Sequence, residues 1–203
     1  MPDFVFPDRL ARVEADRHRR HVFSDEPPSD NFFSYHVPEV VIISVAALEA
    51  GVNEMAQRLS SYEKLELAPG FETMKIAAKW ALLPITTVGK KFDRSASPWQ
   101  DFDLLLKLRN AFVHYEIGKD RPTWMRGLTS RHLCLTKPGD WISTCLSSRV
   151  ALWASNVVPD MFVSIESMLD KENAGDWPWS GRGFLKCDHT GKRVIPDWML
   201  GKT

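Results

Sequence analysis

The sequence has few cysteines, no net charge and no long apolar run. Its three cysteines form no Cys-x-x-Cys pair, which argues against a disulfide framework and favours a reducing compartment. Lysine and arginine total 26, as do aspartate and glutamate, so the chain as a whole has no charge excess that would attract a polyanion. The longest uncharged stretches, 80–89 and 150–159, are ten residues each, about half the length of a membrane-spanning helix. We therefore expect a cytoplasmic protein without a membrane segment.

Several site types are also missing. The first ten residues include Asp3, Asp8 and Arg9 and contain no apolar signal core. There is no Gly-rich phosphate loop, no Gly-x-Ser-x-Gly elbow and no His-Glu-x-x-His helix. Cys187 and His189 are two residues apart, but Cys134 and Cys145 are too distant in sequence to complete a zinc spacing. We expect neither a metal nor a cofactor.

Charge is nevertheless segregated along the chain. Residues 39–72 contain six acidic residues against two basic ones, whereas residues 75–131 contain eleven basic residues against five acidic ones. A local basic surface can attract a phosphate backbone even on a neutral protein. The same charges could instead face many directions and cancel, and the sequence leaves both possibilities open.

Helical periodicity dominates the middle of the chain. Apolar residues recur every three or four positions after Pro38, which suits the first turn of a helix. A second helix is predicted over 71–83, closed by Pro84. The members of the first stripe are Val41, Val45, Leu48, Val52, Met55 and Leu59.

Two further helices follow. Ser97 is a good N-cap with Pro98 at the first helical position, so a third helix is predicted from Trp99 to about Glu116. Ser147 or Ser148 caps a fourth helix, which should kink near Pro159. The apolar stripe of this fourth helix consists of Val150, Trp153, Val157, Met161, Ile165 and Met168.

These patterns predict an all-α fold, a bundle of four to five helices. Residues 1–30 would form an N-terminal polar helix and loop, 31–176 the bundle, and 177–203 a Trp-rich tail packing on it. A small irregular insertion precedes the last long helix, with 132–136 and 141–144 predicted as a short hairpin. The predicted core is Val45, Leu48, Val52, Ile76, Trp80, Leu105, Leu108, Phe112, Trp153, Val157 and Ile165.

The third helix carries the most distinctive residues. Its Leu-rich run ends in Arg109-Asn110-Ala111-Phe112-Val113-His114-Tyr115, which contains the spacing Arg-x4-His. Spacing alone means little, because about one Arg/His pair with four to six intervening residues is expected by chance and the chain has four. Only the pair of Arg109 and His114 lies late in a strongly apolar helix with Asn directly after the Arg.

This helix resembles the active-site helix of the HEPN superfamily, whose core is Arg-Asn-x-x-x-His. The resemblance is sharp over Pro98 to Glu116 and diffuse over Phe32 to Leu169. It implies an HEPN-like helical bundle, a metal-independent endoribonuclease of toxin or defence type, and catalysis by Arg109, Asn110 and His114. It also implies RNA as substrate, a homodimer in which two Arg/His sets share one cleft, and an antitoxin or other partner protein.

The chain departs from this family pattern in one respect. Members paired with a nucleotidyltransferase antitoxin have the pattern Arg-x4-His-x-Tyr, and that Tyr is modified. Here Tyr115 follows His114 directly and Glu116 occupies the position of that Tyr. Control by such a modification is therefore not expected.

Helical geometry gives an independent view of these residues. Asn110 and His114 are one turn apart on one face, while Arg109 and His114 differ by about 140°. Asp103, Lys107, Asn110 and His114 form one polar stripe. Lys107 and Tyr115 are secondary candidates for substrate binding, as are Glu49 and Asn53 on the first helix.

The implied chemistry uses the RNA 2′-hydroxyl as an internal nucleophile, so DNA would not be cleaved. His114 would shuttle the proton, because an imidazole titrates near neutral pH. Arg109 would stabilise the charge that develops on the phosphorane, and Asn110 would orient the phosphate or His114. The products would carry 2′,3′-cyclic phosphate and 5′-hydroxyl ends.

Two other interpretations stay open. Arg109 and His114 could serve a non-catalytic HEPN-like module that binds RNA or nucleotides or mediates dimerisation. Alternatively, the polar stripe could simply be the solvated side of an amphipathic helix in a structural partner protein. A basic surface around His114 favours the enzyme over the other two.

Overall fold

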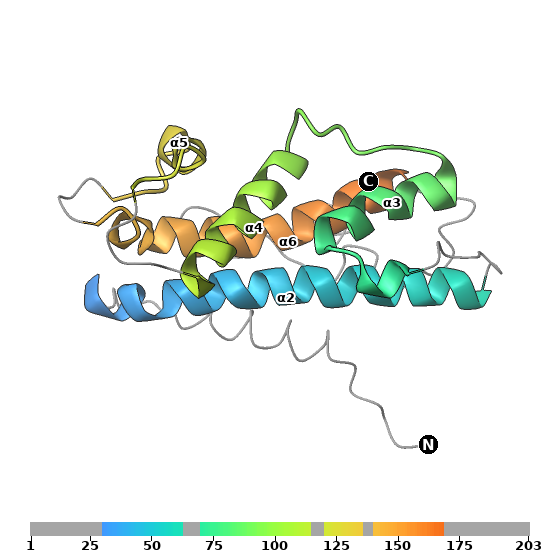
Figure 1. Ribbon diagram of the computed structural model, residues 1–203, viewed down its shortest axis with the longest axis horizontal. Helices are drawn as coiled ribbons and strands as arrows, with labels where there is room; N and C mark the ends of the chain where they lie inside the picture. The colour runs from blue at the N-terminus through green and yellow to red at the C-terminus, as the bar shows by residue number, and fades with distance from the viewer. Residues whose placement is uncertain (1–29, 63–69, 115–119, 136–139, 169–203) are drawn as a thin grey trace, which may run out of the picture.

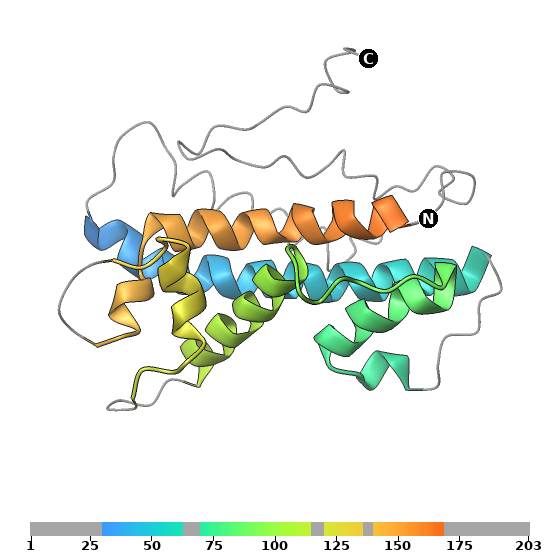
Figure 2. The same cartoon turned by 90° about the horizontal axis from the view of Figure 1, so that it is seen from above.

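Two long helices, α2 (Asp30–Tyr62) and α6 (Ser148–Met168), lie side by side and run in the same direction (Figures 1 and 2). The computed structural model describes residues 30–62, 70–114, 120–135 and 140–168. Gly51 marks the close approach of the pair, because a Cβ atom there would lie 2.2 Å from Cζ of Phe162. A glycine at this point therefore lets α2 and α6 come into contact.

The shorter helices α3 (Ile76–Val88) and α4 (Trp99–Val113) pack against one face of the α2–α6 pair (Figures 1 and 2). A short helix, α5 (Met125–Ser130), follows α4, and two single-turn 3₁₀ helices span Phe71–Thr73 and Ser143–Cys145. The described residues contain five α-helices and no strand, which confirms the predicted all-α bundle. Within these same residues, no helix has the length and apolar character needed to cross a membrane.

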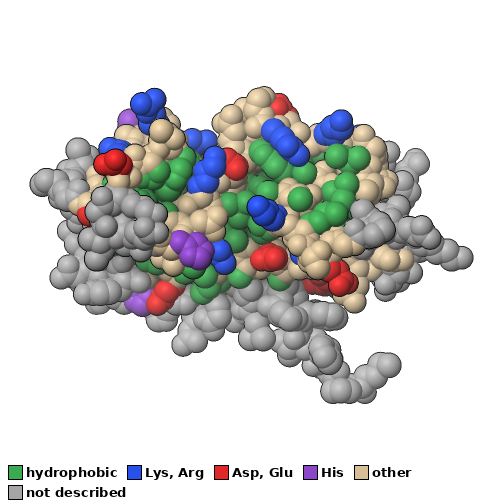
Figure 3. Space-filling model, in the orientation of Figure 1, with side chains coloured by type: hydrophobic (Ala, Val, Ile, Leu, Met, Phe, Trp, Pro, Cys, Tyr) green, Lys and Arg blue, Asp and Glu red, His purple; other side chains and the backbone are tan. Residues whose placement is uncertain are grey.

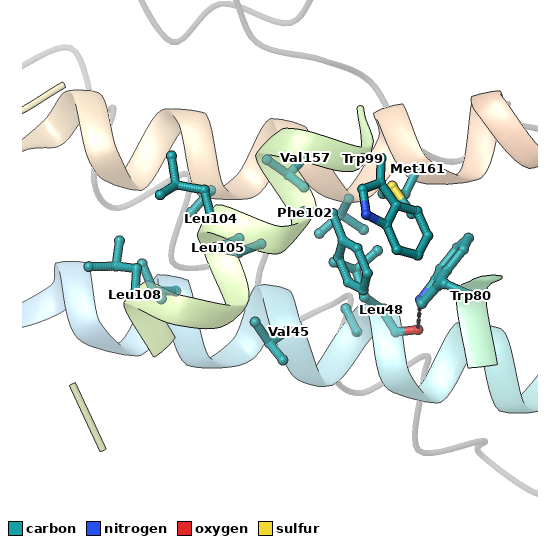
Figure 4. Close-up of a cluster of buried hydrophobic side chains, with 14 of the residues drawn as sticks. Val45, Leu48, Trp80, Trp99, Phe102, Leu104, Leu105, Leu108, Val157 and Met161 are labelled. Carbon is teal, nitrogen blue, oxygen red and sulfur yellow. Dashed lines mark hydrogen bonds between the residues drawn. The ribbon is translucent and has the colours of Figure 1, made fainter. Parts of the chain in front are cut away.

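An aromatic cluster fills the place where the four main helices meet. Trp80 of α3 is fully buried, and its ring centroid lies 5.3 Å from that of Phe162 and 6.2 Å from that of Phe102. Its indole Nε1 donates a hydrogen bond of 3.2 Å to the carbonyl of Leu48, seen as the dashed line in Figure 4. Because the polar end of the indole is satisfied, the whole ring can be buried at low cost.

The predicted core is largely confirmed. Eight of its eleven members are buried, namely Val45, Leu48, Val52, Trp80, Leu105, Leu108, Val157 and Ile165. Ile76, Phe112 and Trp153 are only half-buried and pack against the edge of the core. The helical periodicity therefore predicted which face of each helix is buried. It did not predict how deeply the residues at the edge of that face are buried.

Two of the prolines that were predicted to mark helix ends, Pro38 and Pro84, lie inside helices. Pro38 is an interior residue of α2, which begins eight residues earlier at Asp30. Pro84 lies within α3, which continues to Val88 and ends at Gly89, whose φ of 67° is left-handed. A proline removes one helix hydrogen bond. Here the apolar residues around each proline are buried, including Val37, Val41 and Leu83, and this packing offsets the lost bond.

The predicted cap of α4 is wrong, whereas that of α6 is confirmed. Pro98 is the N-cap of α4, and the hydroxyl of Ser97 bonds to the carboxylate of Asp101 instead of to a backbone amide. At the start of α6, the amide of Val150 donates to Oγ of Ser147 over 3.2 Å. The helix then continues through Pro159 to Met168.

The insertion before α6 is irregular, and the predicted hairpin strands are absent from its described part. A backbone hydrogen bond of 2.7 Å joins the amide of Leu135 to the carbonyl of Thr144, but 143–145 form a 3₁₀ turn. The amides of Ser143 and Thr144 bond to carbonyls three residues earlier, so they are not available for a strand ladder. The loop 136–139, the predicted N-terminal helix and the Trp-rich tail lie outside the described residues.

Candidate functional site

The last turn of α4 presents the three residues predicted to be catalytic. Asn110 and His114 are exposed, and Arg109 beside them is half-buried. His114 is the C-cap residue, and its backbone amide donates to the carbonyl of Asn110 over 2.9 Å. The imidazole therefore belongs to the residue at which the helix ends, at the negative end of the helix dipole.

Arg109 and Asn110 interact directly. Nη1 of Arg109 donates a hydrogen bond of 3.0 Å to Oδ1 of Asn110. Nε of Arg109 is buried and has no hydrogen-bond partner among the described residues. Asn110 was expected to orient the phosphate or His114, whereas in the structure it contacts the guanidinium of Arg109. Asn110 thus positions Arg109 at the surface.

The opposite face of α4 fixes the orientation of this turn. Leu104, Leu105 and Leu108 point from α4 into the space between α2 and α6 (Figure 4), and all three are buried. Because residues three and four apart share a helix face, burying these leucines leaves the polar stripe outside. On that stripe, Nζ of Lys107 lies 2.6 Å from Oδ2 of Asp103, and both side chains are about half-exposed.

The two secondary candidates on α2 do not join this turn. Glu49 and Asn53 are exposed on α2, and Oδ1 of Asn53 accepts a hydrogen bond of 2.8 Å from Nζ of Lys79 on α3. Figure 1 shows α3 beside the C-terminal part of α2, whereas the last turn of α4 lies over its N-terminal part. Asn53 is thus a partner of the buried Lys79, and Tyr115 lies outside the described residues.

A polar junction at the other end of α4 was missed by the sequence analysis. Oδ1 of Asp101 accepts hydrogen bonds from Nε of Arg131, at 2.8 Å, and from Nε1 of Trp153, at 3.2 Å. These contacts connect the first turn of α4 to the residue after α5 and to α6. No sequence motif pointed to this junction, because its members are up to 52 residues apart.

A basic hollow beside α5 was missed as well. Its volume is about 550 Å³, and it is lined by Arg121, Pro122, Thr123, Arg126, Thr129 and Ser130. Nη2 of Arg121 donates to Oγ1 of Thr129 over 2.7 Å, which places one guanidinium at the wall. The signal in the sequence was the basic segment 75–131, which gave the charge but not its location.

That basic segment supplies much of one face of the molecule. Figure 3 shows lysine and arginine side chains spread among apolar ones over the face on which α3 and α4 lie. Among the described members of the segment, the exposed basic residues are Lys75, Lys90, Lys91, Arg94, Lys107, Arg121 and Arg126. The charges are therefore on the surface, where they can act on a phosphate backbone.

Comparison with protein-family models, with curated proteins and with solved structures finds no match for this chain. Across the part of the chain that the structure describes, no three His, Cys, Asp or Glu side chains gather closely enough to bind a metal ion.

Proposed function

We propose that this protein is a metal-independent endoribonuclease, similar to the HEPN enzymes, whose site is the last turn of α4. The observation that carries the proposal is the exposed Asn110 and His114 beside an Arg109 guanidinium that Asn110 positions at 3.0 Å. This set combines a group that can exchange protons near neutral pH with a fixed positive charge.

The reaction begins when the imidazole of His114 accepts the proton of an RNA 2′-hydroxyl. The 2′-oxygen then attacks the adjacent phosphorus, and the bond from phosphorus to the 5′-oxygen breaks. The imidazolium returns the proton to the leaving 5′-oxygen, so no proton is gained or lost overall. Arg109 stabilises the charge on the non-bridging oxygens, which increases as the phosphorane forms.

The site is completed in this proposal by a second copy of the chain. The three residues lie on a convex helix end, and a two-fold axis beside α4 would bring two Arg/His sets together. Light scattering at high micromolar concentration should give the mass of a dimer, and a strict monomer would contradict the composite site.

The substrate experiment uses the purified wild-type chain in excess EDTA. It is incubated with a mixed-sequence RNA and, separately, with the same sequence in 2′-deoxy form, and the product ends are analysed. We expect cleavage of the RNA alone, with 2′,3′-cyclic phosphate and 5′-hydroxyl ends. Cleavage of the deoxy strand, 3′-hydroxyl ends or a requirement for added metal would contradict the mechanism.

The second candidate function is RNA binding without cleavage. It is favoured by the basic hollow, whose two arginines and three hydroxyl side chains can bind phosphate without any catalytic group. Wild-type protein that binds the RNA but leaves it intact would support this function. An absence of both cleavage and binding would leave α4 with a structural role only.

A further inference from the structure

Two cysteine side chains lie in contact in the insertion before α6. Cys134 precedes Leu135 and Cys145 follows Thr144, and the 2.7 Å hydrogen bond between Leu135 and Thr144 joins the two segments at that level. The thiols of Cys134 and Cys145 are close enough to influence each other's pKa, and neither is in a disulfide. A covalent bond between them would therefore link two backbone segments that are already adjacent.

The two thiols have different surroundings. Cys145 is fully buried, with its Sγ 3.5 Å from Sδ of Met125, whereas Cys134 is partly exposed. Cys134 also interacts with the hydroxyls of Thr129 and Thr144 and with the charge of Arg121. Arg121 and Thr129 line the basic hollow, so the accessible thiol lies beside a positively charged opening.

These surroundings shift the pKa values of the two thiols in opposite directions. The hydrogen bond from Cys145, followed by those from Thr129 and Thr144 and by the charge of Arg121, lowers the pKa of Cys134 to about 6 against the opposing effect of burial. The hydrogen bond with Cys134, together with burial, raises the pKa of Cys145. These opposite shifts favour the thiolate, the nucleophilic form of cysteine, at the more accessible Cys134 and the thiol at the buried Cys145.

We propose that Cys134 and Cys145 form a peroxide-reactive dithiol, with Cys134 as the attacking group and Cys145 as the resolving group. The thiolate of Cys134 attacks one oxygen of hydrogen peroxide, the O–O bond breaks, and the departing hydroxide takes up a proton to give water. The sulfenic acid on Cys134 is then attacked by the sulfur of Cys145.

In this second step the S–S bond forms and the S–O bond breaks, and the hydroxide that leaves combines with the proton of Cys145 as a second water. The two thiols supply the two electrons that reduce the peroxide. The resting state is the dithiol, in keeping with a reducing compartment, and a thiol reductant reverses the change.

The experiment uses the full-length chain with Cys187→Ser, which removes the third cysteine. After treatment with a slight excess of hydrogen peroxide, the intact mass should fall by two hydrogen atoms, and dithiothreitol should restore it. In the Cys145→Ser, Cys187→Ser variant, dimedone should label Cys134 instead. The matched Cys134→Ser, Cys187→Ser variant should neither lose mass nor react with dimedone.

The rate of alkylation in the Cys187→Ser protein tests separately which of the two thiols reacts first. Alkylation of Cys134 by iodoacetamide should accelerate as the pH rises through about 6 and level off above it, because the thiolate is the reacting form. The proposal is overturned if peroxide leaves both thiols of the folded Cys187→Ser protein free. It is equally overturned if the disulfide joins two chains, or if Cys145 is alkylated before Cys134.

Discussion

The two faces of α4 are subject to opposite physical constraints. Its inner face, including Phe102, Leu105 and Leu108, is fully buried against α2 and α6. Its outer face runs from Asp103 through Lys107 to Asn110 and His114, and the side chains there are exposed or half-exposed. One helix therefore combines residues whose identity the packing dictates with residues whose identity the packing leaves free.

This difference shows how a helix can be anchored on one face while its last turn stays exposed. The buried leucines fix the rotation and depth of α4, and the last turn is thereby positioned without contributing much to stability itself. Substitutions on the inner face should lower the free energy of unfolding. Those on the outer face should change activity at nearly constant stability.

The largest effect on stability is expected for Phe102→Ala. Phe102 is fully buried and its ring lies 6.2 Å from Trp80 and 5.5 Å from Trp99, so truncation leaves a cavity in the aromatic cluster. Loss of a buried phenylalanine costs about 3–5 kcal/mol, to be measured by urea denaturation. The control Val113→Ala removes an exposed apolar residue of the same helix and should change stability by less than about 0.5 kcal/mol.

The next largest loss of stability is expected at the contact between α2 and α6, the pair of helices against which α4 packs. In Gly51→Ala the new methyl group would overlap the ring of Phe162, because the Cβ position lies 2.2 Å from Cζ. Overpacking of this kind costs about 1–3 kcal/mol. Adding Phe162→Leu should recover part of this loss relative to Phe162→Leu alone, in a double-mutant cycle of denaturation midpoints. Purely additive effects would mean that any cost of Gly51→Ala does not come from overlap with the ring of Phe162.

A smaller loss of stability is expected when either of two carboxylates on α4, Asp101 and Asp103, is replaced by an amide. The Asp101 and Arg131 side chains are mostly buried, so Asp101→Asn should cost about 1.5 kcal/mol through the lost charge-assisted hydrogen bond. Asp103 pairs with Lys107 in a half-exposed position, so Asp103→Asn should cost less than about 0.5 kcal/mol. The two thermal midpoints provide the measurement. Equal costs would show that burial does not distinguish the Asp101 carboxylate from the Asp103 carboxylate.

The smallest change in stability is expected at the last turn. Arg109→Lys keeps the positive charge but loses the planar guanidinium that Asn110 positions. The free energy of unfolding should change by less than about 0.5 kcal/mol. RNA cleavage should fall much more than RNA binding in the same variant, because binding needs only the charge. A filter-binding assay beside a cleavage assay separates the two, and an equal loss in both would assign Arg109 to binding alone.

Periodicity predicted the inner face of α4 and of its neighbours because burial imposes a repeat that the sequence must follow. Val45, Leu48, Leu105 and Leu108 are buried as expected. Helix ends were predicted less well, since Pro38 and Pro84 are tolerated inside helices where tertiary packing offsets a missing hydrogen bond. Local rules for prolines describe isolated helices, and here the surrounding core decides.

The candidate site was predictable only as a set of neighbours in one helix. Arg109, Asn110 and His114 lie within six residues, so their common turn follows from helical geometry. The junction of Asp101, Arg131 and Trp153 and the pairing of Cys134 with Cys145 depend on how distant segments fold together, and no spacing in the sequence indicates them. Contacts of that kind require the three-dimensional structure.

The most direct test of the account compares the same change at two exposed histidines. His114→Asn removes the proposed proton carrier, and His132→Asn makes the identical change at a histidine that also follows an arginine closely in sequence. With RNA in excess EDTA, cleavage by His114→Asn should fall about 10²- to 10⁴-fold relative to wild type. Cleavage by His132→Asn should match wild type. The free energy of unfolding of both variants should stay within about 0.5 kcal/mol of wild type. Equal cleavage by the two variants would contradict the assignment of catalysis to the last turn of α4.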